Sequence, residues 1–346
     1  TYVVIASFYE TLITGINGQD GAYLAQNLIQ KNFKIFGILR RGSTPKNERL
    51  LKLKIHNKIE YLRCDLTEHQ TLQYYIEKIK PNYIYNLAAQ SFVQYSFENP
   101  FNTFKVNFEA VLNILETLRK TNLKKCKFYQ ASTSEMFGNV VKNNNKLINL
   151  NNRFEPVSPY AVSKLFSHHL VKLYRDSYNL YASTGILFNH ESPLRGNEFV
   201  TKKIVENLVN QKFKNGPVLQ LGNIDAARDW GHAKDYVESM VKIMEQKKPD
   251  DYIIASGKLH SVREFFLIVA KYLDFQPKFI GKGFNEICID QISKKVLMKI
   301  SKRYYRDNEL FNLKGDSSIA RKKLKWKPKY TFKKMVKEMI DTEIDQ

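Results

Sequence analysis

The sequence predicts an α/β protein built on a doubly wound parallel sheet. Short apolar runs alternate with longer segments of helical periodicity, which is typical of βαβ units. A glycine-rich turn follows the first apolar run, and polar residues follow several later ones. Ligands of open α/β sheets bind at the carboxyl ends of strands, so these polar residues mark the expected site.

The composition is that of a globular protein. The chain has 346 residues, 43% of them hydrophobic, which fits one large or two medium domains. No apolar run approaches the ~20 residues of a membrane helix, and the N-terminus lacks the basic region of a signal peptide. Cys64, Cys126 and Cys288 are widely spaced and show no metal-ligand spacing. We therefore expect reduced cysteines, a cytoplasmic protein and no metal site.

The net charge of +21 admits two interpretations, a nucleic-acid-binding surface or a lysine-rich solvated surface. The lysines are spread along the chain, and no basic helix or aromatic RNA-binding motif stands out. The second interpretation is favoured, and the positive charge would also give some help in binding anionic small molecules. No nucleic-acid partner is expected.

The secondary structure expected in the first half alternates regularly. Strands are expected at 12–14, 34–39, 59–64, 83–87, 128–131 and 186–188, and a helix at 22–30 has Leu24 and Leu28 on one face. Residues 141–152 are rich in Asn and predict a surface loop. The alternation weakens from residue 189. We expect a first domain over 1–188 and a smaller C-terminal α/β lobe over 189–346, with some segments returning to the first domain.

Glycines at 15, 18 and 21 stand between the first strand and the first helix. They allow a tight turn and the close approach of backbone to a pyrophosphate at the helix N-terminus. The sequence therefore predicts a Rossmann-type domain that binds a dinucleotide. The residues expected around the cofactor at the strand ends are Gly15, Asn17, Gly18, Gln19, Asp20, Gly21, Leu66, Leu87, Ala88 and Ala89.

The end of the second strand distinguishes between the two nicotinamide dinucleotides. An NAD site usually has an acidic residue there, whereas this chain has Arg40 and Arg41. An arginine accommodates a 2′-phosphate, so NADP is predicted, the alternative being two solvated arginines. Asp65, at the end of the third strand, either contacts the adenine amine or caps a helix.

Tyr160 and Lys164 are four residues apart and follow Ser158-Pro159. With Pro159 in the first turn of a helix, both side chains share one face. A nearby ammonium favours the ionised form of a phenol, which then takes a proton from a sugar hydroxyl while hydride leaves for the nicotinamide. Thr133 and Glu135 stand where the fifth strand ends, at the same expected edge of the sheet.

With these residues, the chain resembles the extended short-chain dehydrogenase/reductase family, and within it the GDP-mannose 4,6-dehydratases. The resemblance runs from about residue 11 to the C-terminus. It is carried by the segments TGINGQDGAYLAQNLI, RRGS, CDLTE, YNLAAQSFVQYSFENP, FYQASTSEMFG, SPYAVSKLF, GILFNHESPLRGNEFVTKKI, LGNIDAARDWGHAKDYV and KLKWKP.

The resemblance implies four catalytic residues. Thr133 hydrogen-bonds the sugar 4-hydroxyl, Tyr160 is the base in its oxidation, and Lys164 holds the cofactor ribose and tunes Tyr160. Hydride passes from C4 to NADP, and the resulting ketone acidifies the C5 proton. Glu135 takes that proton and helps to expel the 6-hydroxyl as water, after which hydride returns to C6. From the residues alone, Glu135 is also interpreted as an acid favoured by a helix N-terminus.

The resemblance also implies a GDP-linked substrate and a homodimer or homotetramer. The substrate-binding residues that it implies are Gln90, Ser91, Asn189, Thr201, Lys203, Arg228, Arg306 and Glu309. Alternatives remain for two of them: Arg228 as a surface ion-pair partner of Asp229, and Asn189 as a turn cap. His190 and His232 are expected to pack or hydrogen-bond rather than ligate a metal.

The chain departs from the family pattern in three segments: 42–58 is shorter than in typical bacterial members, and 141–153 and 283–302 diverge. A GDP-manno-heptose is therefore an alternative to GDP-mannose. An epimerase or reductase of the same superfamily shares the glycine turn and the Tyr/Lys pair but has no evident use for Glu135. A non-enzymatic nucleic-acid-binding protein is the remaining hypothesis, and the set of four catalytic residues weighs against it.

Overall fold

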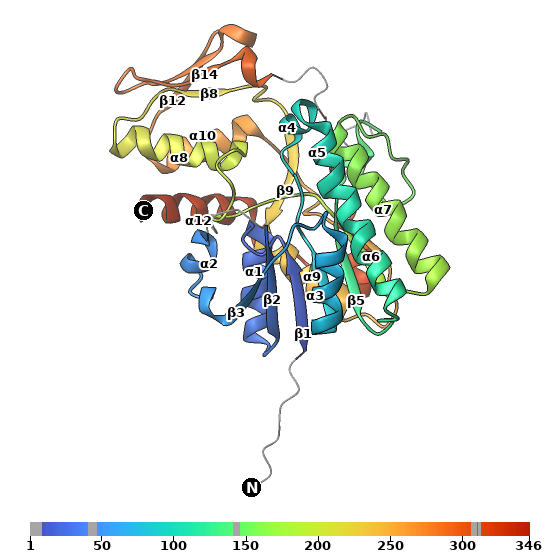
Figure 1. Ribbon diagram of the computed structural model, residues 1–346. Coiled ribbons are helices and arrows are strands. Elements are labelled where there is room, and N and C mark those ends of the chain that lie inside the picture. Colours follow the sequence, from blue (N-terminus) through green and yellow to red (C-terminus); the bar gives the residue numbers. More distant parts are fainter. Residues whose placement is uncertain (1–8, 41–46, 141–145, 306–309, 311–312) are drawn as a thin grey trace.

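The computed structural model describes residues 9–40, 47–140, 146–305, 310 and 313–346 (Figure 1). Three of the predicted site residues, Arg41, Arg306 and Glu309, lie outside the described residues.

A seven-stranded parallel sheet forms the larger part of the molecule, in the order β10-β6-β5-β4-β1-β2-β3. The strands are β1 (Glu10–Thr14), β2 (Lys34–Leu39), β3 (Ile59–Arg63), β4 (Tyr83–Asn86), β5 (Lys127–Thr133), β6 (Ala182–Leu187) and β10 (Asp251–Ile254). The chain leaves β1 toward β2 and β3 on one side and continues through β4, β5 and β6 on the other. The reversal between β1 and β4 opens a crevice at the carboxyl ends of these strands.

Helices cover both faces of this sheet, as Figure 1 shows. Because side chains alternate across a strand, Ile13 and Tyr129 pack with the residues of α1 and α9, whereas Leu12 and Phe128 pack with those of α3, α6 and α7. Both faces are therefore apolar, which explains why the strands are apolar runs. The helices of this part are α1 (Gln19–Gln30), α2 (Glu48–Lys52), α3 (His69–Ile79), α4 (Val93–Glu98), α5 (Pro100–Phe104), a π-helical turn (Lys105–Glu109), α6 (Ala110–Lys120), α7 (Pro159–Tyr178), α9 (Ala233–Met244) and α11 (Ser318–Leu324).

A smaller lobe lies above the carboxyl ends of the large sheet in Figure 1. Its sheets are β11-β9-β7 and β12-β13-β14-β8, packed with α8, α10 and α12 around a core that includes Leu208, Phe265 and Met339. The bounds are β7 (Asn189–Glu191), α8 (Val200–Phe213), β8 (Leu219–Leu221), β9 (Ala227–His232), β11 (Leu259–Ser261), α10 (Val262–Tyr272), β12 (Pro277–Ile280), β13 (Ile287–Asp290), β14 (Val296–Ile300) and α12 (Phe332–Ile344). α9 and β10 return to the large sheet, and the division at residue 188 stays a prediction.

Two expectations about local structure need correction. The sixth strand begins at Ala182, not at residue 186, because Ser183 and Thr184 are fully buried between β5 and β10. The segment 146–152 is not simply a surface loop. Ile148 is 1% exposed and forms a bridge with Gly315, so the described end of the Asn-rich segment is tied to the C-terminal part of the chain.

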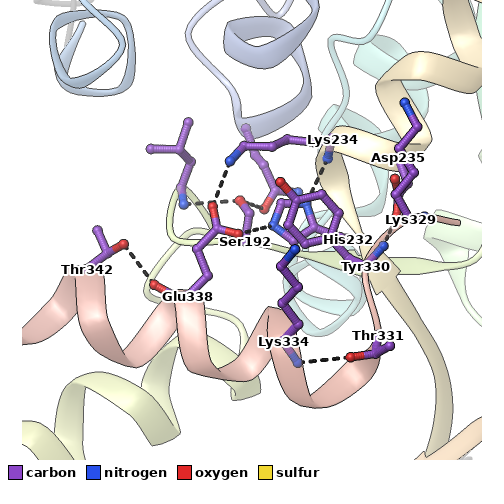
Figure 2. A network of polar contacts seen from close by, with 12 residues as sticks. Ser192, His232, Lys234, Asp235, Lys329, Tyr330, Thr331, Lys334, Glu338 and Thr342 are labelled. Atoms are coloured by element: carbon purple, nitrogen blue, oxygen red, sulfur yellow. Dashed lines mark hydrogen bonds and ion pairs between the residues drawn. The ribbon is translucent and has the colours of Figure 1, made fainter.

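A polar network joins α12 to the start of α9 (Figure 2). Nδ1 of His232 accepts the backbone N–H of Lys234, so Nε2 carries the proton and donates to Glu338 at 3.1 Å. Nζ of Lys234 donates to the second oxygen of Glu338 at 2.7 Å, and the His232 ring stacks on Tyr330. Burial alone would raise the pKa of Glu338, but the hydrogen bonds from His232 and Lys234 lower it to about 2.

The Glu338→Gln variant is expected to be less stable by about 1–2 kcal/mol at neutral pH, because two hydrogen bonds lose their charged acceptor. The pKa of Glu338 is depressed in the folded state, so its contribution is fully present above its ordinary value of 4.5 and is lost as the pH falls toward about 2. Urea unfolding at pH 7 and at pH 3 measures this, and the difference between wild type and variant should shrink at pH 3. Glu77→Gln, on the exposed side of α3, is the matched control. An equal difference at both pH values would contradict the assignment.

Candidate active site

The predicted site residues that the structure describes all line a single cleft of about 1040 Å³. The cleft runs from the glycine turn after β1, across the carboxyl ends of β4 and β5, to the walls formed by β7, α8 and β9. In the sequence, only the expected parallel sheet and the family pattern indicated that these residues lie together. Their individual roles stay proposals.

The glycine turn is closed to larger side chains at two points. Gly15 has φ +68°, and a Cβ there would lie 2.8 Å from the backbone nitrogen of Ala88. A Cβ on Gly21 would lie 2.2 Å from the carbonyl oxygen of Gly15. Gly18 stands at the N-cap of α1 and no side chain caps this helix, so its first N–H groups face the cleft with the positive end of the helix dipole.

A buried polar network joins the ends of β1 and β4 to the middle of β5 and fixes the segment opposite the glycine turn. Oγ1 of Thr14 accepts the N–H groups of Leu87 and Ala88 at 3.1 and 3.0 Å and donates to Asn86 at 2.6 Å. The Asn86 amide in turn donates to Gln130 at 2.8 Å. Sequence analysis did not identify this network, although polar residues at the ends of otherwise apolar strands were a signal for it.

Asp65 orders the turn after β3. Its Oδ1 accepts from both the N–H and the hydroxyl of Thr67, and its Oδ2 lies 3.4 Å from Nε of Arg40. Burial raises the pKa of Asp65, but these bonds and Arg40 together lower it. The N-cap of α3 is Glu68, so the interpretation of Asp65 as a helix cap is wrong. Asp65 holds a turn and contacts one of the two predicted arginines.

The helix α7 starts as the sequence predicts. It begins at Pro159, and Oγ of Ser158 accepts the N–H of Ala161 at 3.1 Å. This start places Tyr160 and Lys164 on one buried face, 8% and 4% exposed. Nζ of Lys164 donates to the carbonyl of Ala131 on β5 at 2.8 Å, which fixes α7 beside the strand that carries Thr133.

Thr133 ends β5 and begins a single 3₁₀ turn, Ser134–Phe137. Its Oγ1 accepts the N–H of Glu135 at 3.3 Å, so the hydroxyl and the carboxylate are held two residues apart on a rigid turn. Both side chains line the cleft with Tyr160. A hydroxyl, a phenol and a carboxylate therefore share one site at the end of a buried strand.

Burial dominates the electrostatics of Tyr160 and Lys164. It raises the pKa of Tyr160 to about 12, although a hydrogen bond with Thr133 acts in the opposite direction. It lowers the pKa of Lys164 to about 8. Lys164 is itself desolvated and donates to Ala131, so the expectation that it favours the ionised form of Tyr160 stays a prediction.

The cleft wall from β7 and α8 contains an ionic cluster that sequence analysis missed. Glu191, 2% exposed, accepts from the hydroxyl of Thr201 at 2.6 Å and lies 3.0 Å from Nε of Arg195. The Arg195 guanidinium lies 3.5 Å from the ring centre of Phe199. The predicted Thr201 thus holds a carboxylate, and Arg195 is a further cation in the cleft. The signal was the arginine four residues after Glu191.

The two alternatives for Arg228 and Asn189 are wrong. Arg228 is 9% exposed and donates to the carbonyls of Ala227 and Leu310, so it is not a surface residue. Asp229 is fully buried and accepts from Ser256 and from the backbone of Gly257 and Gly315. Asn189 belongs to β7 and pairs with Trp230, so it does not cap a turn.

His190 pairs with Asp20 in a partly buried contact beside the glycine turn. Its Nε2 lies 2.7 Å from Oδ2 of Asp20, and its Nδ1 lies 2.8 Å from the carbonyl oxygen of Phe188. Burial lowers the pKa of His190, but Asp20 outweighs it and the net shift is upward. The Lys203 ammonium donates to Gln220, and Ser91 and Gln90 line the cleft after β4. In the described part of the chain, no group of three or more His, Cys, Asp or Glu could hold a metal ion.

Comparison with known proteins identifies the family. The sequence model of the family described as GDP-mannose 4,6 dehydratase matches residues 12–339. The chain belongs to this family. The GDP-mannose 4,6 dehydratase of Drosophila melanogaster is 42% identical, over 96% of this chain and 86% of the relative. The enzymes of that name from Vibrio cholerae and Homo sapiens are 40% and 41% identical, over 97% and 96% of this chain and 93% and 91% of the relatives.

Solved structures resemble the whole fold at lower identity. A UDP-glucose 4-epimerase from Thermotoga maritima superposes with a TM-score of 0.80 at 20% identity, covering 96% of this chain and 98% of that one. A dTDP-glucose 4,6-dehydratase from Streptomyces venezuelae superposes with a TM-score of 0.81 at 18% identity, covering 97% of each chain. At these identities the similarity shows the fold alone.

The pKa of Lys164 can be measured directly. With lysines carrying a carbon label next to the amine, the nuclear magnetic resonance titration should show a lysine with a pKa of about 8, because burial disfavours its charged form. The Lys164→Met variant should lack this resonance and keep the others. Lys203→Met, which removes a less buried amine of the same cleft, should retain it. If the resonance that disappears in the Lys164 variant titrates near 10.5 in the wild type, Lys164 is more solvated than the structure indicates.

Proposed function

We propose that this protein is a GDP-mannose 4,6-dehydratase. It is a hydro-lyase that converts GDP-mannose to GDP-4-keto-6-deoxymannose by loss of water across C5 and C6. The observation that carries the proposal is Glu135 on the same rigid turn as Thr133, in one cleft with Tyr160 and Lys164. A site that only oxidised and reduced a sugar would use the phenol and the hydroxyl, but not this carboxylate. Membership in the family supports the same reaction.

The cleft fits a nicotinamide dinucleotide at the glycine turn. Gly15 and Gly21 stand where any Cβ would collide with backbone, and the uncapped N-terminus of α1 offers N–H donors to a pyrophosphate. The residues that would hold the cofactor include Asn17, Gln19 and Asp20 on the turn, and Leu66, Leu87, Ala88, Ala89 and Lys164 along the strand ends. When bound, the cofactor would supply a hydride acceptor for C4 and the hydride for C6.

We further propose that the cofactor is NADP rather than NAD. Arg40 directly follows β2, where a 2′-phosphate of the adenosine ribose would lie, and its side chain remains 69% exposed. Its neighbour Asp65 lies 3.4 Å away and orients it without covering it. A guanidinium at this position binds a phosphate well and a ribose hydroxyl weakly. Arg41 stays a further candidate.

Tyr160 is the base for the 4-hydroxyl in this mechanism. Thr133 hydrogen-bonds that hydroxyl and so presents its proton to the phenolic oxygen. The high pKa of Tyr160 means that the phenol holds its proton in a dry site, and that a positive charge must approach to favour the phenolate. Lys164 can change its partner from Ala131 to the cofactor ribose and bring its ammonium toward that oxygen.

Glu135 removes the C5 proton once C4 is a ketone. The ketone makes this proton acidic, and the carboxylate is held by the backbone of the 3₁₀ turn rather than by a mobile loop. The same carboxyl can donate a proton to the departing 6-hydroxyl, so one group serves elimination as base and then as acid. Gln90, Ser91, Asn189, Thr201, Lys203 and Arg228 form the walls that would bind the nucleotide sugar, together with Arg306 and Glu309.

Three further features belong to the proposal. The partner is a GDP-linked sugar and not a nucleic acid. The protein is a homodimer or homotetramer, and an apolar surface on α5 and α7 that includes Phe101, 89% exposed, and Phe166, 54% exposed, is suited to a second copy. The compartment is the cytoplasm, in keeping with three buried cysteines that form no disulfide with one another. Across the described residues, no helix is long and apolar enough to cross a bilayer.

Incubation of the purified protein with GDP-mannose and NADP should give a product lighter by one water, with no net formation of reduced nicotinamide. In the Glu135→Gln variant this product should form at least about 100-fold more slowly, because the amide cannot take the C5 proton. NADP binding should be unchanged, and reduced nicotinamide should accumulate. Mass spectrometry and nicotinamide absorbance measure the two effects.

Tyr160→Phe is the matched control for this experiment, because it should stop the reaction before any reduced nicotinamide forms. Rapid dehydration by the Glu135 variant would contradict the mechanism. Turnover of GDP-manno-heptose but not of GDP-mannose would keep the mechanism and change the substrate. Net consumption of NADPH, or epimerisation without loss of water, would contradict the proposed class.

The Arg40→Ala variant should bind NADP about 10-fold more weakly and NAD with little change, because a charge-assisted contact to the 2′-phosphate is lost. Fluorescence titration of the apoprotein with both dinucleotides measures this ratio. Arg63→Ala, at the end of the neighbouring strand β3, is the control for a general loss of positive charge. An equal loss of affinity for both cofactors in the Arg40 variant would show that Arg40 does not read the phosphate.

A further inference from the structure

The short helix α2 joins the glycine turn to the wall of the cleft that β7 and α8 form, and it does so through one arginine. Nε of Arg49 donates at 2.7 Å to the carbonyl of Leu194, in the segment between β7 and α8. Its Nη1 donates at 3.0 Å to the carbonyl of Asn17 on the glycine turn. Arg49 and Asn17 both line the cleft. One side chain from a third element therefore bridges the two sides of the crevice.

The backbone that carries Arg49 is anchored on both sides. Its neighbour Leu50 is fully buried and packs in the same core as α1. Nζ of Lys52 donates to the side chain of Gln346, after α12, at 2.6 Å. Figure 1 shows α2 beside α1 and below α12. Arg49 therefore reaches both carbonyls from a helix that is fixed against the large sheet.

The two acceptors explain why an arginine suits this position. A guanidinium presents its N–H groups in a planar fork, so Nε and Nη1 reach two acceptors at once, whereas a lysine ammonium is a point charge on a flexible chain. Burial lowers the pKa of Arg49, and the negative charge of Glu198 on the opposite wall acts in the other direction. The carboxylate thus attracts the guanidinium toward the wall that it already contacts.

Arg49 extends an attachment of this wall that begins earlier in the segment. Oγ of Ser192 donates at 2.7 Å to Gln19 on the first turn of α1, which fixes the beginning of the wall against the glycine turn. Leu194 lies two residues further on, immediately before Arg195 and the other residues of this segment that line the cleft. The contact with Arg49 therefore holds the part of the wall that would have to move for the crevice to widen.

The proposed reaction gives such a contact a chemical consequence. The hydride that leaves C4 returns to C6 of the same sugar, so the dinucleotide has no need to leave the cleft between the two transfers. If the reduced dinucleotide were released after the first transfer, the 4-keto sugar would lack its hydride donor. The protein would then need a new oxidised dinucleotide for the next turnover. A contact that slows the opening of the crevice therefore prevents the reaction from stopping midway.

We propose that Arg49 retains the bound dinucleotide by holding the wall at Leu194 against the glycine turn at Asn17. This inference rests on the proposed function. Arg49 is a positioning residue, because its guanidinium acts through two backbone carbonyls and not on the reacting atoms. The contact belongs to the closed crevice. Its loss should therefore raise the dissociation rate of the dinucleotide more than it lowers the association rate.

The test mixes the NADPH-loaded protein with excess NADP and follows the loss of bound NADPH fluorescence by stopped flow. Arg49→Lys and Arg49→Met should each release NADPH about 10-fold faster than the wild type, because at least one charged hydrogen bond of the closed crevice is lost. The association rate should stay within about 2-fold, which separates this role from a general loss of folded protein. During turnover of GDP-mannose, both variants should also leave more free NADPH per product in the filtrate after rapid ultrafiltration.

Lys52→Met is the matched control, because it removes one positive charge from an exposed position of the same helix. It should change neither rate. Release of NADPH from Arg49→Lys at the wild-type rate would overturn the inference, and so would a change confined to association. Either result, with dehydration of GDP-mannose by the wild type, would leave the proposed function standing. A wild-type protein that binds neither NADP nor NADPH would overturn both.

Discussion

The hydroxyl of Thr14 hydrogen-bonds between β1 and β4, the two strands at which the connections of the large sheet change direction. It satisfies the N–H groups of Leu87 and Ala88 and donates to Asn86, which is bonded to Gln130 on the next strand. A buried N–H group without an acceptor costs about 1–3 kcal/mol, so this hydroxyl stabilises the backbone of Leu87 and Ala88, where the chain leaves the sheet after β4. The glycine turn packs directly on Ala88, so the shape of the cofactor crevice depends on this contact.

The cleft surrounds a dry centre with paired charges. Asp20 lies against His190, and Glu191 lies between Thr201 and Arg195, so each of these two carboxylates has a partner. Among the described residues, Lys164 and Tyr160 have no such ionic partner of comparable strength, and burial shifts the pKa of each toward its neutral form. Side chains that are paired thus surround Tyr160 and Lys164, whose pKa values burial shifts toward the neutral forms.

The sequence could predict what depends on local pattern. The apolar runs, the glycines at 15, 18 and 21, and Ser158-Pro159 before Tyr160 each specify a strand, a turn or a helix start, and the structure has them there. It could not show that Thr184 lies in a buried strand, because that burial is supplied by its β10 partner Asp251, 67 residues later. The role of Glu191 was hidden for the same reason. Its partner Thr201 comes from a helix, and only the tertiary fold brings the two together.

The fold itself does not select the reaction. An epimerase and a dehydratase superpose on this chain with nearly the same TM-score, so a shared sheet, crevice and small lobe serve both chemistries. Elimination differs because it needs a carboxylate that reaches the carbon next to the ketone. The position of this carboxylate must stay fixed when the sugar moves. Glu135 meets this requirement because its backbone lies in a 3₁₀ turn capped by Thr133, the residue that would also bind the 4-hydroxyl. In the proposed mechanism, oxidation and elimination are thereby linked through one short segment at the end of β5, and the rest of the cleft would have only to hold the substrate in a single orientation.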